Sequence, residues 1–168
     1  MIPSFKRNTC GFTLVEIIVT LLLMGIIAAT VLGRAISTEQ IDLSSATDKI
    51  RIHILYAQSM AMKYGDRIWG IRCQADPNQY WLFFGTNPDN SANQVRLPGE
   101  QNVMVSLSEL GVSMNAFNLF FDRIGKPYTA YTDETNNSPV SAANPLSLTI
   151  TAGDSRTLTI TPETGLIQ

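Results

Sequence analysis

The chain has 168 residues, and its 12 Lys and Arg against 14 Asp and Glu give a formal charge of −2. This length holds one ordinary domain and an attached element. The balance of charge excludes the overall basic character of a typical nucleic-acid binder, while a local basic patch stays compatible with it. Charged residues form only 15% of the chain, against about 25% in soluble domains. Because the deficit lies in the first third, the composition indicates a membrane-anchored protein.

An apolar run at residues 12–33 is the first predicted element. Its only ionisable side chain is Glu16, and a helix of about 20 residues can cross a hydrocarbon core of ~30 Å. Lys6 and Arg7 precede the run, so the positive-inside tendency predicts a single-pass topology with a cytoplasmic N-terminus. Two alternatives stay open: a plain anchor, and a secretory signal peptide cleaved near Ala28 and Ala29.

Glu16 is the feature that a plain anchor does not explain. A carboxylate in hydrocarbon costs several kcal/mol unless it is paired or neutralised. Cleavage after Gly11 would make Phe12 the N-terminus and would place an ammonium group one helical turn from Glu16. The carboxylate would then pair with its own terminus or with that of a neighbouring copy.

The segment "GFTLVEIIVTLLLMGIIAA" resembles the N-terminal signature of type IV prepilins and type II secretion pseudopilins. The resemblance implies a leader at residues 1–11, which a prepilin peptidase removes between Gly11 and Phe12, and N-methylation of Phe12. It implies that Glu16 acts in assembly by neutralising the terminus of an adjacent subunit. It also implies a structural subunit with no enzymatic activity, whose partners are other major and minor pilins and an inner-membrane assembly platform.

The next predicted element is an amphipathic helix at 34–65 that continues the apolar run. Its apolar positions recur at three- and four-residue steps, and Gly65 follows Tyr64 as a C-cap. These positions are Ile41, Leu43, Ala46, Ile50, Ile54, Ala57 and Ala61. Such a one-sided helix requires a partner surface.

Residues 66–168 are predicted to form a β-rich periplasmic domain that supplies this surface. Short runs rich in β-branched and aromatic residues indicate strands at 67–73, 79–85, 103–107, 118–122, 146–152 and 156–162. The last two alternate apolar residues with Thr or Ser around "AGDS", which predicts a hairpin whose leucines and isoleucines face the helix. The segment 131–145 is predicted to be a long exposed excursion. The fold class is α+β, with one long helix on an antiparallel sheet.

This region resembles the minor pseudopilins and pilins of the GspH/FimT type through "ILYAQSMAMKYGDRI", "FFDRIGKP" and "TLTITPETGLI". The resemblance implies a minor subunit of a type II secretion pseudopilus or a type IV pilus, located in the bacterial inner membrane and in a periplasmic or extracellular filament. The alternative is a pilus-tip minor pilin that binds DNA or cargo.

Residues with catalytic or ligating chemistry are sparse. His53 is the only histidine and lies in the amphipathic helix without a second imidazole or a CxxC nearby, so we predict no catalytic residues, no metal site and no cofactor. A tethered hydrolase would require carboxylates that converge with His53. Asn87, Asp89 and Ser91 faintly resemble a calcium loop but lack its Gly and distal Glu. Cys10 precedes the apolar run, so Cys73 is predicted to be unpaired and buried.

The nucleic-acid alternative depends on three cations near the end of the amphipathic helix. Lys63, Arg67 and Arg72 lie close in sequence with Trp69 between them, and cations with an interleaved aromatic can contact single-stranded nucleic acid. Scattered surface cations beside a core tryptophan are the competing interpretation.

Overall fold

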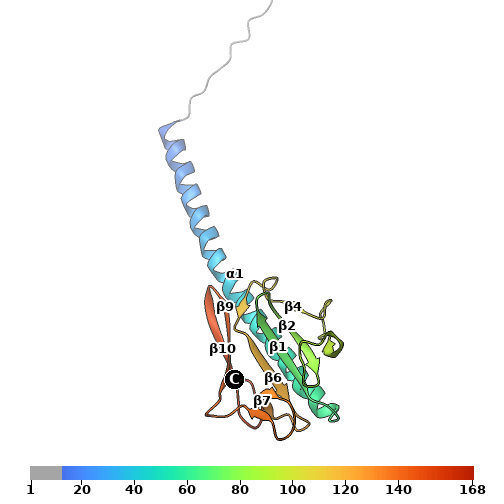
Figure 1. Ribbon diagram of the computed structural model, residues 1–168. Helices are drawn as coiled ribbons and strands as arrows, with labels where there is room; N and C mark the ends of the chain where they lie inside the picture. The colour runs from blue at the N-terminus through green and yellow to red at the C-terminus, as the bar shows by residue number, and fades with distance from the viewer. Residues whose placement is uncertain (1–12) are drawn as a thin grey trace, which may run out of the picture. The chain divides into compact units, whose positions relative to one another are not determined.

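The computed structural model describes residues 13–168, except for the side chains of 31–41. The chain divides into two units at Thr38, and helix α1 (Leu14–Lys63) contributes to both. Figure 1 shows α1 followed by the strands of the second unit, residues 39–168. The helix ends at Lys63, one residue before the predicted end. Gly65 is not among the glycines with positive φ, so it does not form the left-handed C-cap that we predicted.

The second unit is built on the apolar face of α1, as the spacing predicts. Six of the seven predicted apolar positions are buried, while Ile41 lies outside the described side chains. Ile54, Ala57 and Ala61 are fully covered. Small alanines on this face let the strands approach the helix closely, which explains why the face combines alanine with isoleucine.

The larger sheet has the strand order β3-β2-β1-β6-β7-β8, and β4 also pairs with β2. All its pairings are antiparallel. The strands are β1 (Trp69–Ala75), β2 (Asn78–Phe84), β3 (Gln94–Val95), β4 (Val105–Ser106), β6 (Phe117–Phe121), β7 (Pro127–Tyr131) and β8 (Asn137–Pro139). The predicted strand at 103–107 shortens to β4, and the predicted excursion at 131–145 contains β8.

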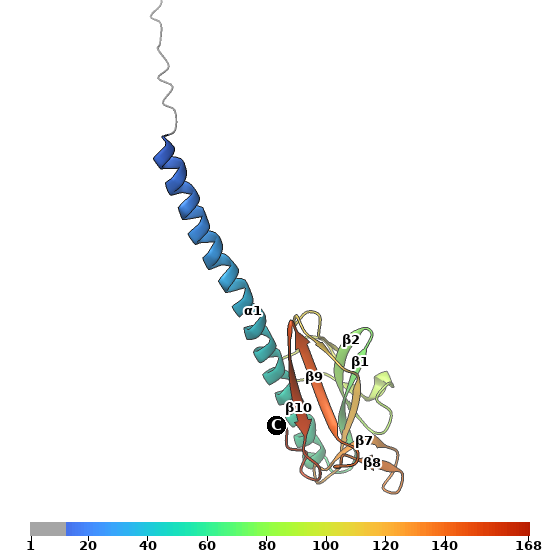
Figure 2. The same ribbon diagram turned by 90° about the vertical axis from the view of Figure 1, so that its left-hand side faces the viewer.

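The smaller sheet has the order β10-β9-β5, made of β5 (Ser113–Met114), β9 (Leu146–Ala152) and β10 (Asp154–Ile160). Figure 2 shows β9 and β10 side by side. The hairpin was predicted, and Leu148, Ile150, Leu158 and Ile160 are buried, Leu146 is half-buried, and its threonines are exposed. The second strand begins at Asp154 and not at Arg156, because the connection is the single residue Gly153, whose φ is +69°.

Two hydrophobic clusters hold the domain together. The main cluster contains the apolar face of α1 and inward side chains of both sheets, among them Ile71, Leu82 and Leu148. We predicted one sheet on the helix; the structure has two, and both contribute to this one core. A smaller cluster of Trp81, Phe83, Phe120 and Tyr128 lies apart from it. These observations confirm the α+β fold class with an antiparallel sheet packed on an N-terminal helix.

Candidate functional site

The N-terminal segment contains the residues predicted for processing and assembly. Gly11 and Phe12 lie outside the described residues. Glu16 is in the first turn of α1, and its backbone N–H donates to the Thr13 hydroxyl at 3.3 Å. Thr13 and Glu16 therefore have the Thr-x-x-Glu spacing of a helix capping box. A carboxylate at this end also interacts favourably with the positive end of the helix dipole.

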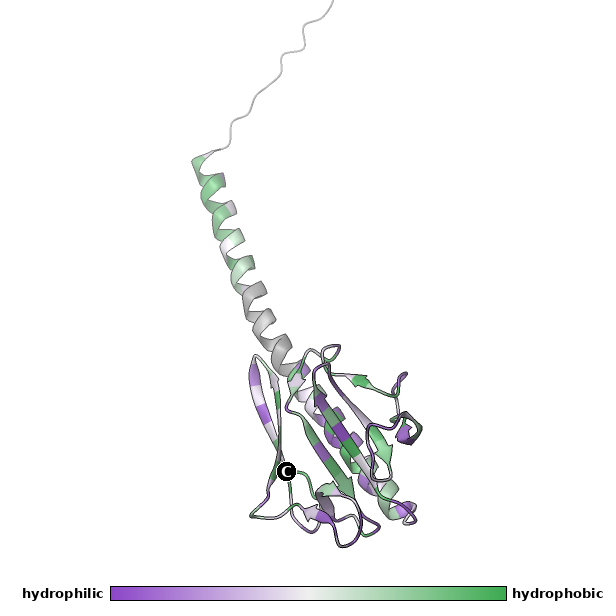
Figure 3. Ribbon diagram, in the orientation of Figure 1, coloured by the Kyte–Doolittle hydropathy of each residue, from purple (hydrophilic) through white to green (hydrophobic). Residues whose placement is uncertain are grey.

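The first turns of α1 expose apolar side chains on every side. Leu14 is 76% exposed and Met24 is 70% exposed, and Figure 3 shows this part of the helix as hydrophobic. The hydroxyls of Thr20 and Thr30 donate to the Ile17 and Ile27 carbonyls at 2.9 and 2.8 Å, so their polar groups are satisfied within the helix. In the part of the chain that the structure describes, no helix has the length and apolarity needed to cross a membrane.

The predicted cations Lys63 and Arg67 lie close to aromatic rings at the end of α1. The Lys63 ammonium is 5.1 Å from the centre of the Tyr64 ring, and the Arg67 guanidinium carbon is 5.2 Å from that of Phe84. Arg67 also donates to Asp66 at 2.7 and 3.0 Å. This hydrogen-bonded pair lowers the pKa of the Asp66 carboxyl.

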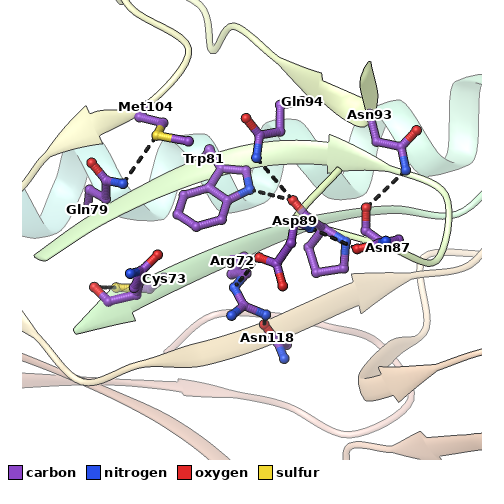
Figure 4. A network of polar contacts seen from close by, with 12 residues as sticks. Arg72, Cys73, Gln79, Trp81, Asn87, Asp89, Asn93, Gln94, Met104 and Asn118 are labelled. Atoms are coloured by element: carbon purple, nitrogen blue, oxygen red, sulfur yellow. Dashed lines mark hydrogen bonds and ion pairs between the residues drawn. The ribbon is translucent and has the colours of Figure 1, made fainter. Parts of the chain in front are cut away.

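Arg72 occupies a different environment because side chains alternate along β1. Trp69, Ile71 and Cys73 belong to the main core, so Arg72 points to the opposite side of the sheet. There its Nε is 3.1 Å from Asp89 Oδ1, and its guanidinium lies 5.9 Å from the Trp81 ring (Figure 4). Arg67 lies against Phe84, the residue opposite Trp69, whereas Arg72 lies on the other side of the sheet, so these two cations do not share one face.

In the polar loop at 87–94, side-chain oxygens accept hydrogen bonds from backbone N–H groups of the same loop. Asn87 Oδ1 accepts from the Asp89 N–H, and Asn90 Oδ1 accepts from the Ala92 N–H, both at 3.0 Å. The Pro88 carbonyl accepts from Trp81 Nε1 at 2.9 Å, which fastens the loop over the sheet (Figure 4). Within the described residues, no group of three or more His, Cys, Asp or Glu side chains is arranged to hold a metal ion.

His53 of α1 is buried in a polar network with Tyr80 of β2 and with Pro98 and Glu100 of the loop after β3. Its Nε2 is 3.3 Å from the Pro98 carbonyl, and its Nδ1 is 2.8 Å from the Tyr80 hydroxyl. A carbonyl only accepts hydrogen bonds, so Nε2 carries the proton and Nδ1 accepts from Tyr80. Glu100 lies 3.7 Å from Nε2 and forms an ion pair with Lys49 at 2.6 Å. Burial lowers the pKa of His53, and the nearby carboxylate opposes that shift only in part.

Cys73 is a buried free thiol in β1. Burial raises its pKa to about 12, and the thiolate that reacts and binds metals is therefore scarce at neutral pH. The prediction that Cys73 is buried is confirmed.

A polar cleft of about 450 Å³ opens beside the end of α1. On its wall, the Tyr128 hydroxyl donates to Asp122 Oδ2 at 3.0 Å, and Asp122 Oδ1 accepts two backbone N–H groups of its own turn. Burial, helped by Asp122, raises the pKa of Tyr128 to about 12. The cleft is lined by Gly65, Asp66, Arg67, Ile68, Asp122, Arg123, Ile124, Tyr128, Tyr131, Glu134 and Asn137.

The Thr13 cap and the partners of His53 were not predicted from the sequence. The cap at Thr13 was detectable, because Thr-x-x-Glu before an apolar run is a helix-start pattern. The partners of His53 had no such signal, since Tyr80 and Glu100 are far from it in sequence and are brought to it by tertiary structure.

Comparison with protein families identifies one match. Residues 6–32 match the family described as "Prokaryotic N-terminal methylation motif", a motif typical of type IV pilins and pseudopilins. Pilins with this motif are structural subunits and not enzymes. Comparison with curated proteins and with solved structures gave no match.

Proposed function

We propose that the chain is a minor pseudopilin or pilin subunit of a type II secretion pseudopilus or a type IV pilus. A prepilin peptidase would cut between Gly11 and Phe12 and the new terminus would be N-methylated. The apolar helix would then anchor the subunit in the inner membrane and later pack into a filament, with residues 66–168 outside the cytoplasm. The observation that carries the proposal is the methylation motif at residues 6–32.

The arrangement around Glu16 supports a role in assembly. Glu16 lies in the first turn of a helix whose exposed side chains from Leu14 to Ile27 are almost all apolar. If lipid or other protein surrounds this segment, Glu16 is the one charged side chain within it. A carboxylate in such surroundings needs a cation. The methylated terminus of an adjacent subunit would provide this cation. The hydrogen bond from the Glu16 N–H to the Thr13 hydroxyl caps the start of the helix.

The alternative of a DNA-binding tip receives less support from the contacts. Arg67 is paired with Asp66 and Arg72 with Asp89, so phosphate binding would have to displace a carboxylate at each position. The competing interpretation of separate surface cations accounts for all three residues.

The proposal is tested by co-expression of the chain with a prepilin peptidase, followed by intact mass and N-terminal sequencing. Wild type should yield a chain that begins at methylated Phe12. Gly11→Ala should lose that product, whereas Glu16→Ala should retain it and fail only in assembly with other pilins. Cys10→Ala, one residue earlier, is the matched control and should still be cut. A wild-type chain that stays full-length, or that is cut near Ala29, would contradict the proposal.

A further inference from the structure

The polar cleft beside the end of α1 has walls whose carboxylates are already paired. Oδ1 of Asp122 accepts two backbone N–H groups of its own turn, and its Oδ2 accepts from the Tyr128 hydroxyl. Asp66 accepts two hydrogen bonds from Arg67. The cleft has a volume of about 450 Å³, which lies in the range of about 300–1,000 Å³ that small-molecule sites have. The walls are thus held by their own contacts and leave room for a ligand.

Two charged groups on the cleft wall, Arg123 and Glu134, have no such partner. Both residues are exposed. Across the side chains that the structure describes, neither forms an ion pair, and their charged atoms lie more than 4.0 Å from each other. The cleft therefore offers one guanidinium and one carboxylate that do not neutralise each other.

Tyr131 adds an aromatic surface near both of these charges. Burial raises the pKa of Tyr131, the Glu134 carboxylate raises it further, and the Arg123 guanidinium lowers it. The Tyr131 ring meets the Tyr128 ring edge-on, with the ring centres 5.2 Å apart, and Tyr131 is only half-buried. Part of its ring thus lines the cleft. An aromatic face attracts a cation that lies within about 6 Å of the ring centre.

Gly65 keeps the Arg123 side of the cleft open. Its φ is not positive, so the backbone at this position does not require glycine. A Cβ at residue 65 would lie 3.3 Å from the Arg123 Cβ, which is closer than the optimal separation of about 3.5–4.0 Å between carbon atoms. The missing side chain thus lets the stem of Arg123 lie against the end of α1.

The mixture of charges disfavours a ligand with charge of one sign. An anion at Arg123 would also meet the carboxylates of Glu134 and Asp122, and a cation at Glu134 would also meet the Arg123 guanidinium. A ligand that carries both charges satisfies both groups at once. Its carboxylate can accept two parallel hydrogen bonds from the guanidinium, and its ammonium group can lie beside Glu134 and the Tyr131 ring.

We propose that this cleft binds a small zwitterion of dipeptide size, whose carboxylate pairs with Arg123 and whose ammonium group pairs with Glu134 beside the Tyr131 ring. A dipeptide suits the cleft better than a single amino acid, because its two charges lie at opposite ends of the molecule and the two protein groups are separated. This binding role goes beyond the proposed function and does not depend on processing after Gly11.

The test uses the full chain in detergent micelles and three probes of similar shape: Ala-Ala, N-acetyl-Ala-Ala and Ala-Ala-amide. The second probe lacks the ammonium group, and the third lacks the carboxylate. NMR titration of the Tyr131 amide signal gives the affinities. Ala-Ala should bind at millimolar concentration. Each blocked probe should bind roughly fivefold more weakly, as expected for the loss of one exposed ion pair.

Two variants assign each charge of the ligand to its partner. Arg123→Gln should abolish the preference for Ala-Ala over Ala-Ala-amide and retain the preference over N-acetyl-Ala-Ala. Glu134→Gln should do the converse. Both residues are exposed, so the fold should tolerate these changes. Arg96→Gln and Glu109→Gln change exposed charges outside the cleft and should leave all three affinities as they are.

Several outcomes would overturn the proposal. Absence of binding at tens of millimolar Ala-Ala, equal affinities of the three probes, or charge preferences that survive both cleft variants would each do so. Tighter binding of glycerophosphoethanolamine than of Ala-Ala would identify a lipid headgroup as the ligand and would also overturn it. None of these results bears on cleavage after Gly11, which N-terminal sequencing tests separately.

Discussion

The buried His53 network predicts a specific loss of stability on acidification. His53 is 3% exposed and its pKa is lowered from 6.5, because burial penalises the charged imidazolium. Glu100 and the Pro98 carbonyl raise that pKa, while Lys49 lowers it further. The unfolded chain thus binds the proton more tightly than the folded chain does. The contribution of a neutral His53 is complete above pH 6.5 and is lost as the pH falls through the lowered folded pKa.

The magnitude of the network's contribution follows from its two hydrogen bonds. His53→Leu would leave the fully buried Tyr80 hydroxyl and the Pro98 carbonyl without this partner. An unsatisfied buried group costs about 1–3 kcal/mol. With a loss of about 2 kcal/mol, the melting temperature of a chain of this size should fall by about 4–8 °C.

The assay is thermal unfolding of the full chain in detergent, followed by circular dichroism from pH 8 to pH 5. Because the chain has one histidine, the matched control is His53→Gln, whose amide can donate to Pro98 and accept from Tyr80 without titrating. It should remain within about 1 kcal/mol of wild type at pH 8 and should lose the dependence on pH that wild type shows below pH 6.5. Equal pH dependence in the two proteins, or unchanged stability of His53→Leu, would refute this account of the network.

Three further predictions concern packing and connection. Cys73, with a pKa of about 12, should resist alkylation in a folded Cys10→Ser background at pH 8 and react fully in urea; mass spectrometry that detects rapid labelling of the folded chain would contradict its burial. Gly70→Ala should destabilise the domain by about 3 kcal/mol or more, because the new Cβ would lie within 3 Å of the Phe83 ring and closer still to the Leu119 carbonyl. The urea midpoint of unfolding should therefore drop. Gly25→Ala, whose Cβ would meet open space, should leave the midpoint unchanged. Gln58→Ala removes two hydrogen bonds, to the Gly125 and Thr164 carbonyls at 2.9 and 2.8 Å, and should cost about 1–3 kcal/mol of unfolding free energy. Gln58→Glu should cost more at pH 7 than below pH 4, since an ionised carboxylate cannot donate a hydrogen bond. Equal urea midpoints of this variant at the two pH values would contradict the role of the two hydrogen bonds.

Strong periodicity explains which elements could be predicted from the sequence. The apolar face of α1 repeats over five turns, and Leu148, Ile150, Leu158 and Ile160 alternate with threonines in the hairpin, so each signal is repeated several times within one element. The division into two sheets had no such local signal. The smaller sheet also takes in β5, whose two residues pair with β9 across more than thirty residues of sequence.

The candidate cations show a related limit. Closeness in sequence left two interpretations of Lys63, Arg67 and Arg72, one basic strip or scattered surface cations, and the alternation of side chains along β1 places Arg72 on the side of the sheet opposite Trp69. That outcome was available from the period of two in a strand. The ion pair of Arg72 with Asp89 could not be predicted in this way. The loop that carries Asp89 is held in place by the hydrogen bond from the Trp81 indole N–H to the Pro88 carbonyl, which forms only in the folded chain.

The bonds between α1 and the C-terminal segment have a mechanical consequence. Arg51 donates to the Ile167 carbonyl at 2.9 Å, and Gln58, about two helical turns further along the same side of α1, donates to the Thr164 carbonyl at 2.8 Å. A pull along the helix axis would load these bonds together, in shear, with the buried side chains of the same face. Force applied to the helix would thus spread over the chain's last strand and tail at once, and would not open the domain one bond at a time from its first strand.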